Sequence, residues 1–150
     1  MEWIKIILIS MLPVSELRGS IPYAMIVGYN PLEAYLISVA GNFFPVPILL
    51  YTLKQFDPLF RKIPYLGKIY EKIIAIGDRR KGIVEKYGYP GLIIFVAIPL
   101  PVTGAWTGSI VSFILGLNPK KASLFILAGI LIAGIIVTSA TYGIKLAIFG

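Results

Sequence analysis

Residues 12–22 read Leu-Pro-Val-Ser-Glu-Leu-Arg-Gly-Ser-Ile-Pro, and this stretch interrupts an otherwise apolar part of the chain. Glu16 and Arg18 lie in it, and they are the only charged residues between Lys5 and Glu33. Proline removes a backbone donor and disturbs helices, so a helix break is predicted here. The stretch therefore predicts short helices on both sides of a break that contains two charged side chains.

The composition around this break is that of a membrane protein. Of 150 residues, 57% are hydrophobic and 14% are charged, whereas ordinary soluble domains carry about 25% charged residues. A chain of this length cannot bury so much apolar surface inside one globule. We expect a single membrane domain over residues 1–150, multi-pass in the cell membrane, with lipids as its surroundings.

Two residue types are missing altogether, because the chain contains no cysteine and no histidine. Disulfides, Cys-His and Ser-His-Asp catalytic sets and the common zinc sites are thereby excluded. The net charge of +7 is concentrated in one region, and no aromatic-plus-basic ribbon for nucleic acid occurs. The sequence predicts no enzyme, no cofactor, no metal and no nucleic-acid partner.

The chain also repeats itself at an offset of 88 residues. Without a gap, residues 12–41 share 11 identities in 30 positions with residues 100–129. The matches include Leu-Pro-Val at 12 and 100, and Gly-x-Asn-Pro at 28 and 116. Apolar composition does not place an Asn-Pro pair and two glycines in register. We predict one unit used twice, with repeat 1 at about 3–53 and repeat 2 at about 89–149.

Each repeat predicts the same order of helices. A glycine closes the second short stretch, and the Asn-Pro pair opens a long one. Helices should therefore end near Val27 and Leu115, and new helices should begin at Pro31 and Pro119. The long segments are 31–53 and 119–149. Both exceed the roughly 20 residues that cross a hydrocarbon core, so both are predicted to be spans.

Two topologies remain open for the short stretches, which at about 10 residues reach only halfway across a bilayer. They form either a re-entrant hairpin, which makes the two repeats inverted, or one kinked span, which makes them parallel. Nine Lys and Arg residues lie in the connector, residues 54–88. The positive-inside rule places this connector in the cytoplasm in both topologies.

The connector is itself patterned. Its apolar residues follow helical spacing, with basic residues on other faces: Leu66, Ile69, Tyr70, Ile73, Ile74 and Gly77. This pattern predicts an amphipathic helix at the membrane surface, with its basic side near anionic headgroups. The alternative is a connector that is basic only to fix orientation.

The charged break predicts a site. An ionised side chain at the membrane midplane costs about 2.5–3.5 kcal/mol and usually has a function. Pro13, Gly19 and Pro22 are predicted to keep the backbone irregular, so that Glu16 and Arg18 share a side. We expect a polar cavity in which Ser15, Glu16 and Arg18 bind a substrate or a proton. The alternative is an ion pair that only fastens two hairpins together.

The second break is uncharged and offers hydroxyls and one large ring. Thr103, Trp106 and Thr107 are predicted to line the facing wall, although threonine can also serve packing and Trp106 can anchor at the interface. The residues predicted to break the helix here are Pro99, Pro101, Gly104 and Gly108. Asn42, within the first span, is expected to bond to a neighbouring helix or to line the cavity through local unwinding.

Two motifs carry a family resemblance. Residues 13–22 resemble the Glu-Leu-Arg-Gly-[Ala/Ser]-Ile-Pro signature of the small multidrug export family, and residues 99–108 resemble its second motif, with Val102 where glycine is common. The resemblance covers nearly the whole chain. More distantly, the chain resembles the DedA/VTT superfamily, whose members carry two opposed re-entrant hairpins. The resemblance implies an all-α polytopic membrane protein with an inverted repeat, each copy a re-entrant hairpin plus a transmembrane helix.

These observations lead to an expected function as a small secondary transporter. Glu16 would bind a proton or a cationic substrate group, and Arg18 would neutralise it or hold an anionic headgroup. The alternatives are a lipid or polyprenyl-phosphate transporter or scramblase of DedA/VTT type and a non-transporting structural subunit. A small organic or lipid substrate and a homodimeric partner are expected.

Overall fold

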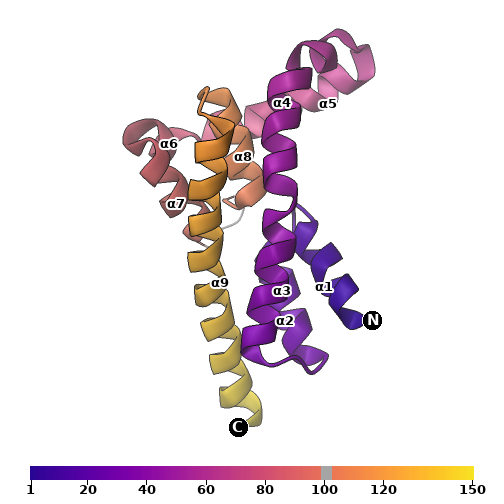
Figure 1. Ribbon diagram of the computed structural model, residues 1–150, viewed down its shortest axis with the longest axis vertical. Helices are drawn as coiled ribbons and strands as arrows, with labels where there is room; N and C mark the ends of the chain where they lie inside the picture. Colours follow the sequence, from indigo (N-terminus) through magenta and orange to yellow (C-terminus); the bar gives the residue numbers. More distant parts are fainter. Residues whose placement is uncertain (99–102) are drawn as a thin grey trace.

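The computed structural model describes residues 1–98 and 103–150, and this part of the chain is helical throughout, without strands (Figure 1). Its helices are α1 (Glu2–Met11), α2 (Glu16–Ile26), α3 (Pro31–Phe43), α4 (Pro45–Lys62), α5 (Pro64–Arg80), α6 (Gly82–Tyr87), α7 (Tyr89–Ala97), α8 (Ala105–Ile114) and α9 (Pro119–Phe149). The all-α prediction is confirmed.

Two long rods run side by side in opposite directions and form the frame of the molecule (Figure 1). One consists of α3 and α4, which together span 32 residues, and the other is α9 with 31. At 1.5 Å per residue each rod is about 46–48 Å long, which is enough to cross a bilayer. These two rods are the candidate membrane spans among the described residues.

The first span differs from its prediction in two ways. A turn at Phe44 separates α3 from α4, and α4 continues to Lys62 rather than ending at Leu53. Pro45 occupies the first turn of α4, where no intrahelical N–H bond is lost, so the rod resumes directly after the turn. The connector therefore begins as an extension of the rod.

The helices end and begin close to the predicted residues. α2 and α8 end one residue before Val27 and Leu115, and the following glycines, Gly28 and Gly116, have φ values of 104° and 69°. Asparagine side chains then cap α3 and α9, which begin at prolines. Because positive φ costs glycine little, the chain reverses direction at the same place in each repeat.

Helices α1 and α2 fold back along one another. The hydroxyl of Tyr23, near the end of α2, donates a hydrogen bond of 2.7 Å to the carboxylate of Glu2, at the start of α1. In the second repeat, the hydroxyl of Tyr89, at the start of α7, accepts a 2.9 Å bond from the N–H of Asn118, which follows α8. Figure 1 shows the first pair beside the lower part of the rods and the second pair beside the upper part.

Equivalent glycines pack the short helices onto the rods. A Cβ added at Gly41 would lie 3.0 Å from the Ile7 carbonyl oxygen on α1, and one at Gly129 would lie 2.7 Å from Cβ of Val96 on α7. These glycines correspond at the repeat offset of 88. Close backbone approach through small residues drives helix packing in membranes, where lipid is as apolar as the helices themselves.

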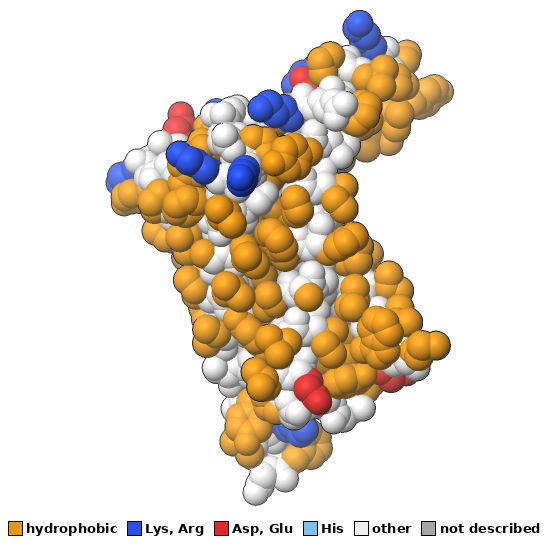
Figure 2. Space-filling model, in the orientation of Figure 1, with side chains coloured by type: hydrophobic (Ala, Val, Ile, Leu, Met, Phe, Trp, Pro, Cys, Tyr) orange, Lys and Arg blue, Asp and Glu red, His pale blue; other side chains and the backbone are white. Residues whose placement is uncertain are grey.

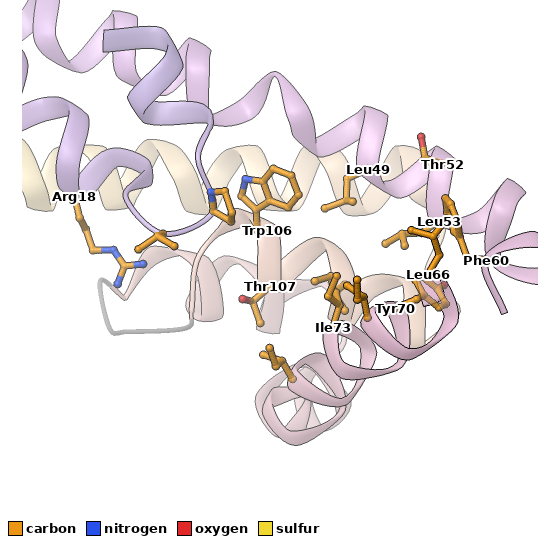
Figure 3. Close-up of a pocket in the computed structure, with 15 residues that line it drawn as sticks. Arg18, Leu49, Thr52, Leu53, Phe60, Leu66, Tyr70, Ile73, Trp106 and Thr107 are labelled. Atoms are coloured by element: carbon orange, nitrogen blue, oxygen red, sulfur yellow. The ribbon is translucent and has the colours of Figure 1, made fainter. Parts of the chain in front are cut away.

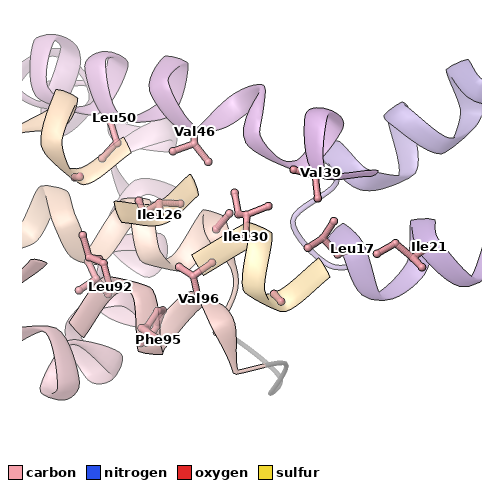
Figure 4. Close-up of a cluster of buried hydrophobic side chains, with 14 of the residues drawn as sticks. Leu17, Ile21, Val39, Val46, Leu50, Leu92, Phe95, Val96, Ile126 and Ile130 are labelled. Atoms are coloured by element: carbon pink, nitrogen blue, oxygen red, sulfur yellow. The ribbon is translucent and has the colours of Figure 1, made fainter. Parts of the chain in front are cut away.

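The core lies between the rods and the short helices. Figure 4 shows a part of this cluster of buried apolar side chains. Ile21 of α2, Leu92 of α7, and Ile126 and Ile130 of α9 are fully buried. α9 therefore contributes to the packing of both repeats.

The connector packs across the upper end of the molecule (Figure 1). Gly77 of α5 fits against Ile110 and Ile114 of α8. Leu66 and Ile69 of the same helix remain largely exposed. Thus the amphipathic helix predicted from spacing is present, but its apolar residues divide between protein contacts and an open surface.

Charge is distributed unequally between the two ends. Eleven of the 14 Lys and Arg residues lie in 54–86 or at the start of α9, and these segments meet at the upper end in Figure 1. On the face shown in Figure 2, the middle of the molecule is mainly hydrophobic and the blue side chains gather above it. This distribution is that of a membrane protein with a basic end.

Candidate functional site

The first break is a tight turn rather than a long irregular segment. It occupies residues 12–15, and α2 begins directly at Glu16. The hydroxyl of Ser15 donates a 2.6 Å hydrogen bond to the carbonyl of Ile9, which ties the turn back to α1. Glu16 has φ of 44°, a left-handed conformation that is uncommon for a residue other than glycine.

The predicted helix-breaking residues need correction. Gly19 and Pro22 lie inside α2, and Gly108 lies inside α8. Pro22 costs the helix one N–H bond, and prolines are tolerated within membrane helices because neighbouring groups satisfy the freed carbonyl. Gly19 and Gly108 serve packing instead, since an added Cβ would crowd Cβ of Ser15 or a methyl of Val96.

The other predicted breakers fall into two groups. Pro13 is in the turn between α1 and α2, and Gly104 directly precedes α8. Pro99 and Pro101 lie outside the described residues. The first break is therefore short, and helical backbone carries most of its motif, residues 16–22 of 13–22.

Glu16 is buried where the two repeats meet. Its side chain is only 4% exposed, and Oε1 accepts a 3.2 Å hydrogen bond from the backbone N–H of Trp106. The N–H of Ala105 is a second backbone donor to this carboxylate. Both donors belong to the first turn of α8, where free N–H groups and the helix dipole favour a negative charge. Glu16 thus caps a helix of the other repeat.

Gly104 makes this approach possible. A Cβ at this position would overlap the carboxylate of Glu16. Trp106 adds a second link, because its indole N–H donates a 2.9 Å bond to the Met11 carbonyl at the end of α1. Together these contacts join the start of α8 to both sides of the first break.

The contact between Glu16 and Gly104 joins two positions that are equivalent in the internal repeat. At the offset of 88, Glu16 corresponds to Gly104, and Arg18 corresponds to Trp106. The equivalent positions 16 and 104 of the two copies therefore lie against each other. One copy supplies the charge, and the other supplies the space and the N–H donors.

A small pocket adjoins the carboxylate. It has a volume of about 20 Å³ and is lined by Glu16, Leu17, Arg18, Asn42, Val96, Thr103, Gly104, Ala133 and Val137. Roughly 10–15 Å³ is needed for one water molecule, so the pocket admits a single small species. Asn42 is 2% exposed, and its Oδ1 has no hydrogen-bond partner among the described residues. A buried acceptor without a partner in such a pocket is a position where a water molecule can bind by donating a hydrogen bond.

Arg18 also lines a much larger groove (Figure 3). Its volume is about 750 Å³, which is within the range of sites for organic ligands. It is lined by Pro13, Val14 and Arg18 of the first repeat, by Leu49, Thr52, Leu53 and Phe60 of α4, by Leu66, Ile69, Tyr70, Ile73 and Ile76 of α5, and by Trp106, Thr107 and Ile110 of α8.

Tyr70 is held in this wall by the connector. Its hydroxyl donates a hydrogen bond to Asp57 of α4, and the Arg61 guanidinium lies 5.7 Å from the centre of its ring. Burial, together with this bond to Asp57, raises the pKa of the Tyr70 phenol well above its usual value, so the side chain is neutral at physiological pH.

The predicted site residues are therefore divided between two cavities. Glu16, Asn42 and Thr103 line the small pocket, Trp106 and Thr107 line the groove, and Arg18 lines both. Ser15 lines neither and bonds to α1 instead. The sequence did not predict the α4 and α5 wall, although the helical spacing of apolar residues in the connector was a signal for it.

The described residues contain no group of three or more His, Cys, Asp or Glu side chains suited to a metal ion. No curated protein and no solved structure is significantly similar to this chain. A family model does match, over residues 16–136, and its range includes Glu16, the connector and α8. The chain therefore belongs to the family described as putative small multi-drug export proteins.

Proposed function

We propose that this protein is a multi-pass transporter of the cell membrane that exports small organic molecules and couples their movement to protonation of Glu16. The observation that carries the proposal is the buried Glu16 carboxylate, which caps α8 across the meeting point of the two repeats. A buried ionisable group within a membrane domain is a functional site by default, because its charge is costly there.

The proposed topology is an inverted repeat of re-entrant hairpins. The four short helices have 9–11 residues and are therefore about 14–17 Å long, roughly half of a hydrocarbon core. The pairs α1–α2 and α7–α8 approach the middle of the rods from opposite ends (Figure 1). The basic end, which carries eleven of the 14 Lys and Arg residues, then faces the cytoplasm.

The contact between the Glu16 carboxylate and the start of α8 suggests how protonation of Glu16 moves α8. As a carboxylate, Glu16 accepts from the first N–H groups of α8 and interacts favourably with the helix dipole. When Glu16 takes up a proton it loses its negative charge, and the cap weakens. The start of α8 is then free to move away from the first break.

Movement at this contact would produce alternating access. α8 connects the first break to the groove, because Trp106 bonds to both Glu16 and Met11 while its ring lines the groove wall. A change in the Glu16 cap is therefore transmitted to the larger cavity. Rocking of one repeat against the other around a fixed site is the usual behaviour of inverted-repeat transporters.

Purified protein in proteoliposomes tests this function. Vesicles containing the pH-sensitive dye pyranine receive either tetraphenylphosphonium, a lipophilic cation, or naphthalenesulfonate, a lipophilic anion. We expect one of them to drive proton flux through the wild-type protein. Glu16→Gln should reduce this flux by at least about tenfold, because the amide keeps an acceptor oxygen but carries no exchangeable charge.

Glu33→Gln is the matched control, because Glu33 is an exposed helix-capping residue far from the break in sequence. This variant should transport as the wild type does. Full proton-coupled flux through folded Glu16→Gln would remove Glu16 from the mechanism. If neither tetraphenylphosphonium nor naphthalenesulfonate drives proton flux through the wild-type protein, the transporter assignment itself is contradicted.

A further inference from the structure

A second groove lies between α2 and the C-terminal part of α9. Its volume is about 470 Å³, which is again within the range of sites for organic ligands. Its walls are apolar except at Thr141 and Lys145. The Thr141 hydroxyl donates a 2.7 Å hydrogen bond to the Val137 carbonyl of its own helix. Among the described lining residues, the Lys145 ammonium is therefore the one charged group that a ligand in this groove meets.

This groove is the counterpart, in the second repeat, of the large groove between α4 and α8. Three pairs of their lining residues correspond at the offset of 88: Pro22 with Ile110, Thr141 with Leu53, and Ile148 with Phe60. Helix α5 covers part of the large groove, because Gly77 fits against Ile110 and Ile114 of α8. Ile26 of α2, which corresponds to Ile114, is instead 82% exposed. The α2–α9 groove is thus open along its side.

In the proposed topology, Lys145 lies at the level of the lipid headgroups. Residues 122–144 of α9, 23 in all, contain no charged residue. They are about 34 Å long, close to the roughly 30 Å of a hydrocarbon core. Lys120 and Lys121 precede this stretch at the basic end, and Lys145 follows it at the other end. The open side of the groove then faces hydrocarbon, while its cation lies at the membrane surface.

The charge of Lys145 is not paired within the described chain. No hydrogen bond or ion pair joins its ammonium group to another described residue. The carboxylates of the first repeat that start helices have other partners. Glu2 accepts from the Lys5 ammonium, and Glu33 accepts from the backbone N–H of Asn30. An anionic ligand therefore meets no acidic competitor bonded to Lys145.

We propose that the α2–α9 groove binds an anionic phospholipid of the leaflet away from the basic end, with its phosphate beside Lys145 and an acyl chain along Ile144, Thr141 and Pro22. The assignment rests on the proposed topology and goes beyond the transport of organic molecules. A phospholipid has its charge and its apolar chain at the two depths where the groove has a cation and apolar walls. Attraction of one lysine near a membrane surface corresponds to an enrichment of about fivefold for an anionic over a neutral lipid.

A fluorescent label at the rim of the groove measures this enrichment locally. The chain has no native cysteine, so Ile26→Cys takes a single bimane label at a lining position that is largely exposed. The protein is reconstituted in bilayers of phosphatidylcholine with a small fraction of phosphatidylglycerol, and a nitroxide is placed on the acyl chain of one lipid or the other. At equal mole fraction, we expect nitroxide phosphatidylglycerol to quench this label as strongly as about five times as much nitroxide phosphatidylcholine.

A second label separates the groove from the general attraction of a basic protein. Leu146→Cys places the bimane at the same depth on α9, at an exposed position that does not line the groove. This label should show little preference between the two lipids. An equal preference at both positions would mean that phosphatidylglycerol gathers around the whole protein, and the proposed site would be overturned.

Variants at Lys145 test the cation in the Ile26→Cys background. Lys145→Gln should abolish the preference for phosphatidylglycerol, while Lys145→Arg should retain it, because a cation remains. Lys120→Gln is the matched control, since it removes an exposed cation from the other end of the same helix. It should leave the preference unchanged. An unchanged preference in Lys145→Gln would contradict the proposal.

A further pair of variants tests the place of the acyl chain. Thr141→Phe fills the groove from within and should remove the preference, whereas Ser139→Phe adds similar bulk at an exposed position of α9 outside it. Ser139→Phe should behave as the parent does. Circular dichroism of both variants should match the parent, which separates loss of the site from loss of the fold. If Thr141→Phe keeps the full preference, the lipid does not lie in the groove and the proposal fails.

The remaining outcomes identify other occupants. Equal quenching by both lipids in the parent would mean that the groove takes any acyl chain, and displacement of phosphatidylglycerol by naphthalenesulfonate would make it a site for soluble organic anions. Absence of quenching, with excimer emission from pyrene attached at Ile26→Cys, would mean that a second copy covers the groove. Each of these results overturns the proposal. The assay measures no flux, so lipid preference without proton-coupled transport would support the site while contradicting the proposed function.

Discussion

At the scale of single residues, the site depends on the fit between Glu16 and Gly104. The carboxylate occupies the space where any other residue at 104 would place its Cβ. These two positions are equivalent at the repeat offset of 88 residues. The Glu16 side chain of the first copy therefore requires a residue without a side chain at position 104 of the second. The positive φ of Glu16 shows that the backbone of the first break is also shaped to bring the carboxylate to this point.

We therefore expect Gly104→Ala to displace Glu16 and destabilise the protein by about 1–3 kcal/mol, the usual cost of overpacking a well-packed site. The measurement is the thermal unfolding midpoint in detergent, read by circular dichroism. Gly143→Ala is the control, because a Cβ there meets nothing within 4 Å, and the midpoint should be unchanged or higher. An undisturbed midpoint in Gly104→Ala would show that Glu16 does not lie against this glycine.

At the scale of elements, each long helix depends on its asparagine cap. The side chain of Asn30 accepts a 2.9 Å bond from the N–H of Glu33, and the Glu33 side chain accepts from the N–H of Asn30. Asn118 accepts from the N–H groups of Lys120 and Lys121 in the same way. These caps begin α3 and α9 where the chain reverses after each short helix pair.

Asn30→Ala should lower the free energy of unfolding by about 1 kcal/mol, because the N–H of Glu33 in the first turn loses its side-chain acceptor. Asn30→Asp keeps a side-chain oxygen at the same position and should cost much less. Both values follow from thermal or denaturant unfolding of the reconstituted protein. Equal losses for alanine and aspartate would show that the cap does not determine where α3 begins.

At the scale of the whole molecule, the two short helix pairs lie beside opposite parts of the rods (Figure 1), and we propose that they enter the membrane from opposite sides. The chain has no native cysteine, so single cysteines at Tyr29 and Asn118 report on sidedness without interference. In the inverted topology, an impermeant maleimide applied to intact cells should label Tyr29→Cys, and Asn118→Cys should react only after the membrane is opened. Labelling of both from the same side would instead require parallel repeats with four crossings.

Much of the local structure could be predicted from the sequence. The helix ends at Val27 and Leu115 and the starts at Pro31 and Pro119 follow from glycine, asparagine and proline chemistry, which acts within a few residues. The extent of the breaks could not be predicted this way. Pro22 lies within α2, because a proline interrupts a helix only when its surroundings do not satisfy the freed carbonyl.

By itself, the amino-acid sequence determined the helical class, the internal repeat of motifs, the two candidate spans and the presence of a charged break, since these depend on composition, periodicity and local capping. Only the tertiary structure decided that Glu16 caps α8, that Arg18 lines both a water-sized pocket and a large groove, and that α4 and α5 form the wall of that groove. These features arise between residues up to about 90 positions apart in the chain. Contacts of that range depend on how whole helices pack, and no local pattern of residues specifies them.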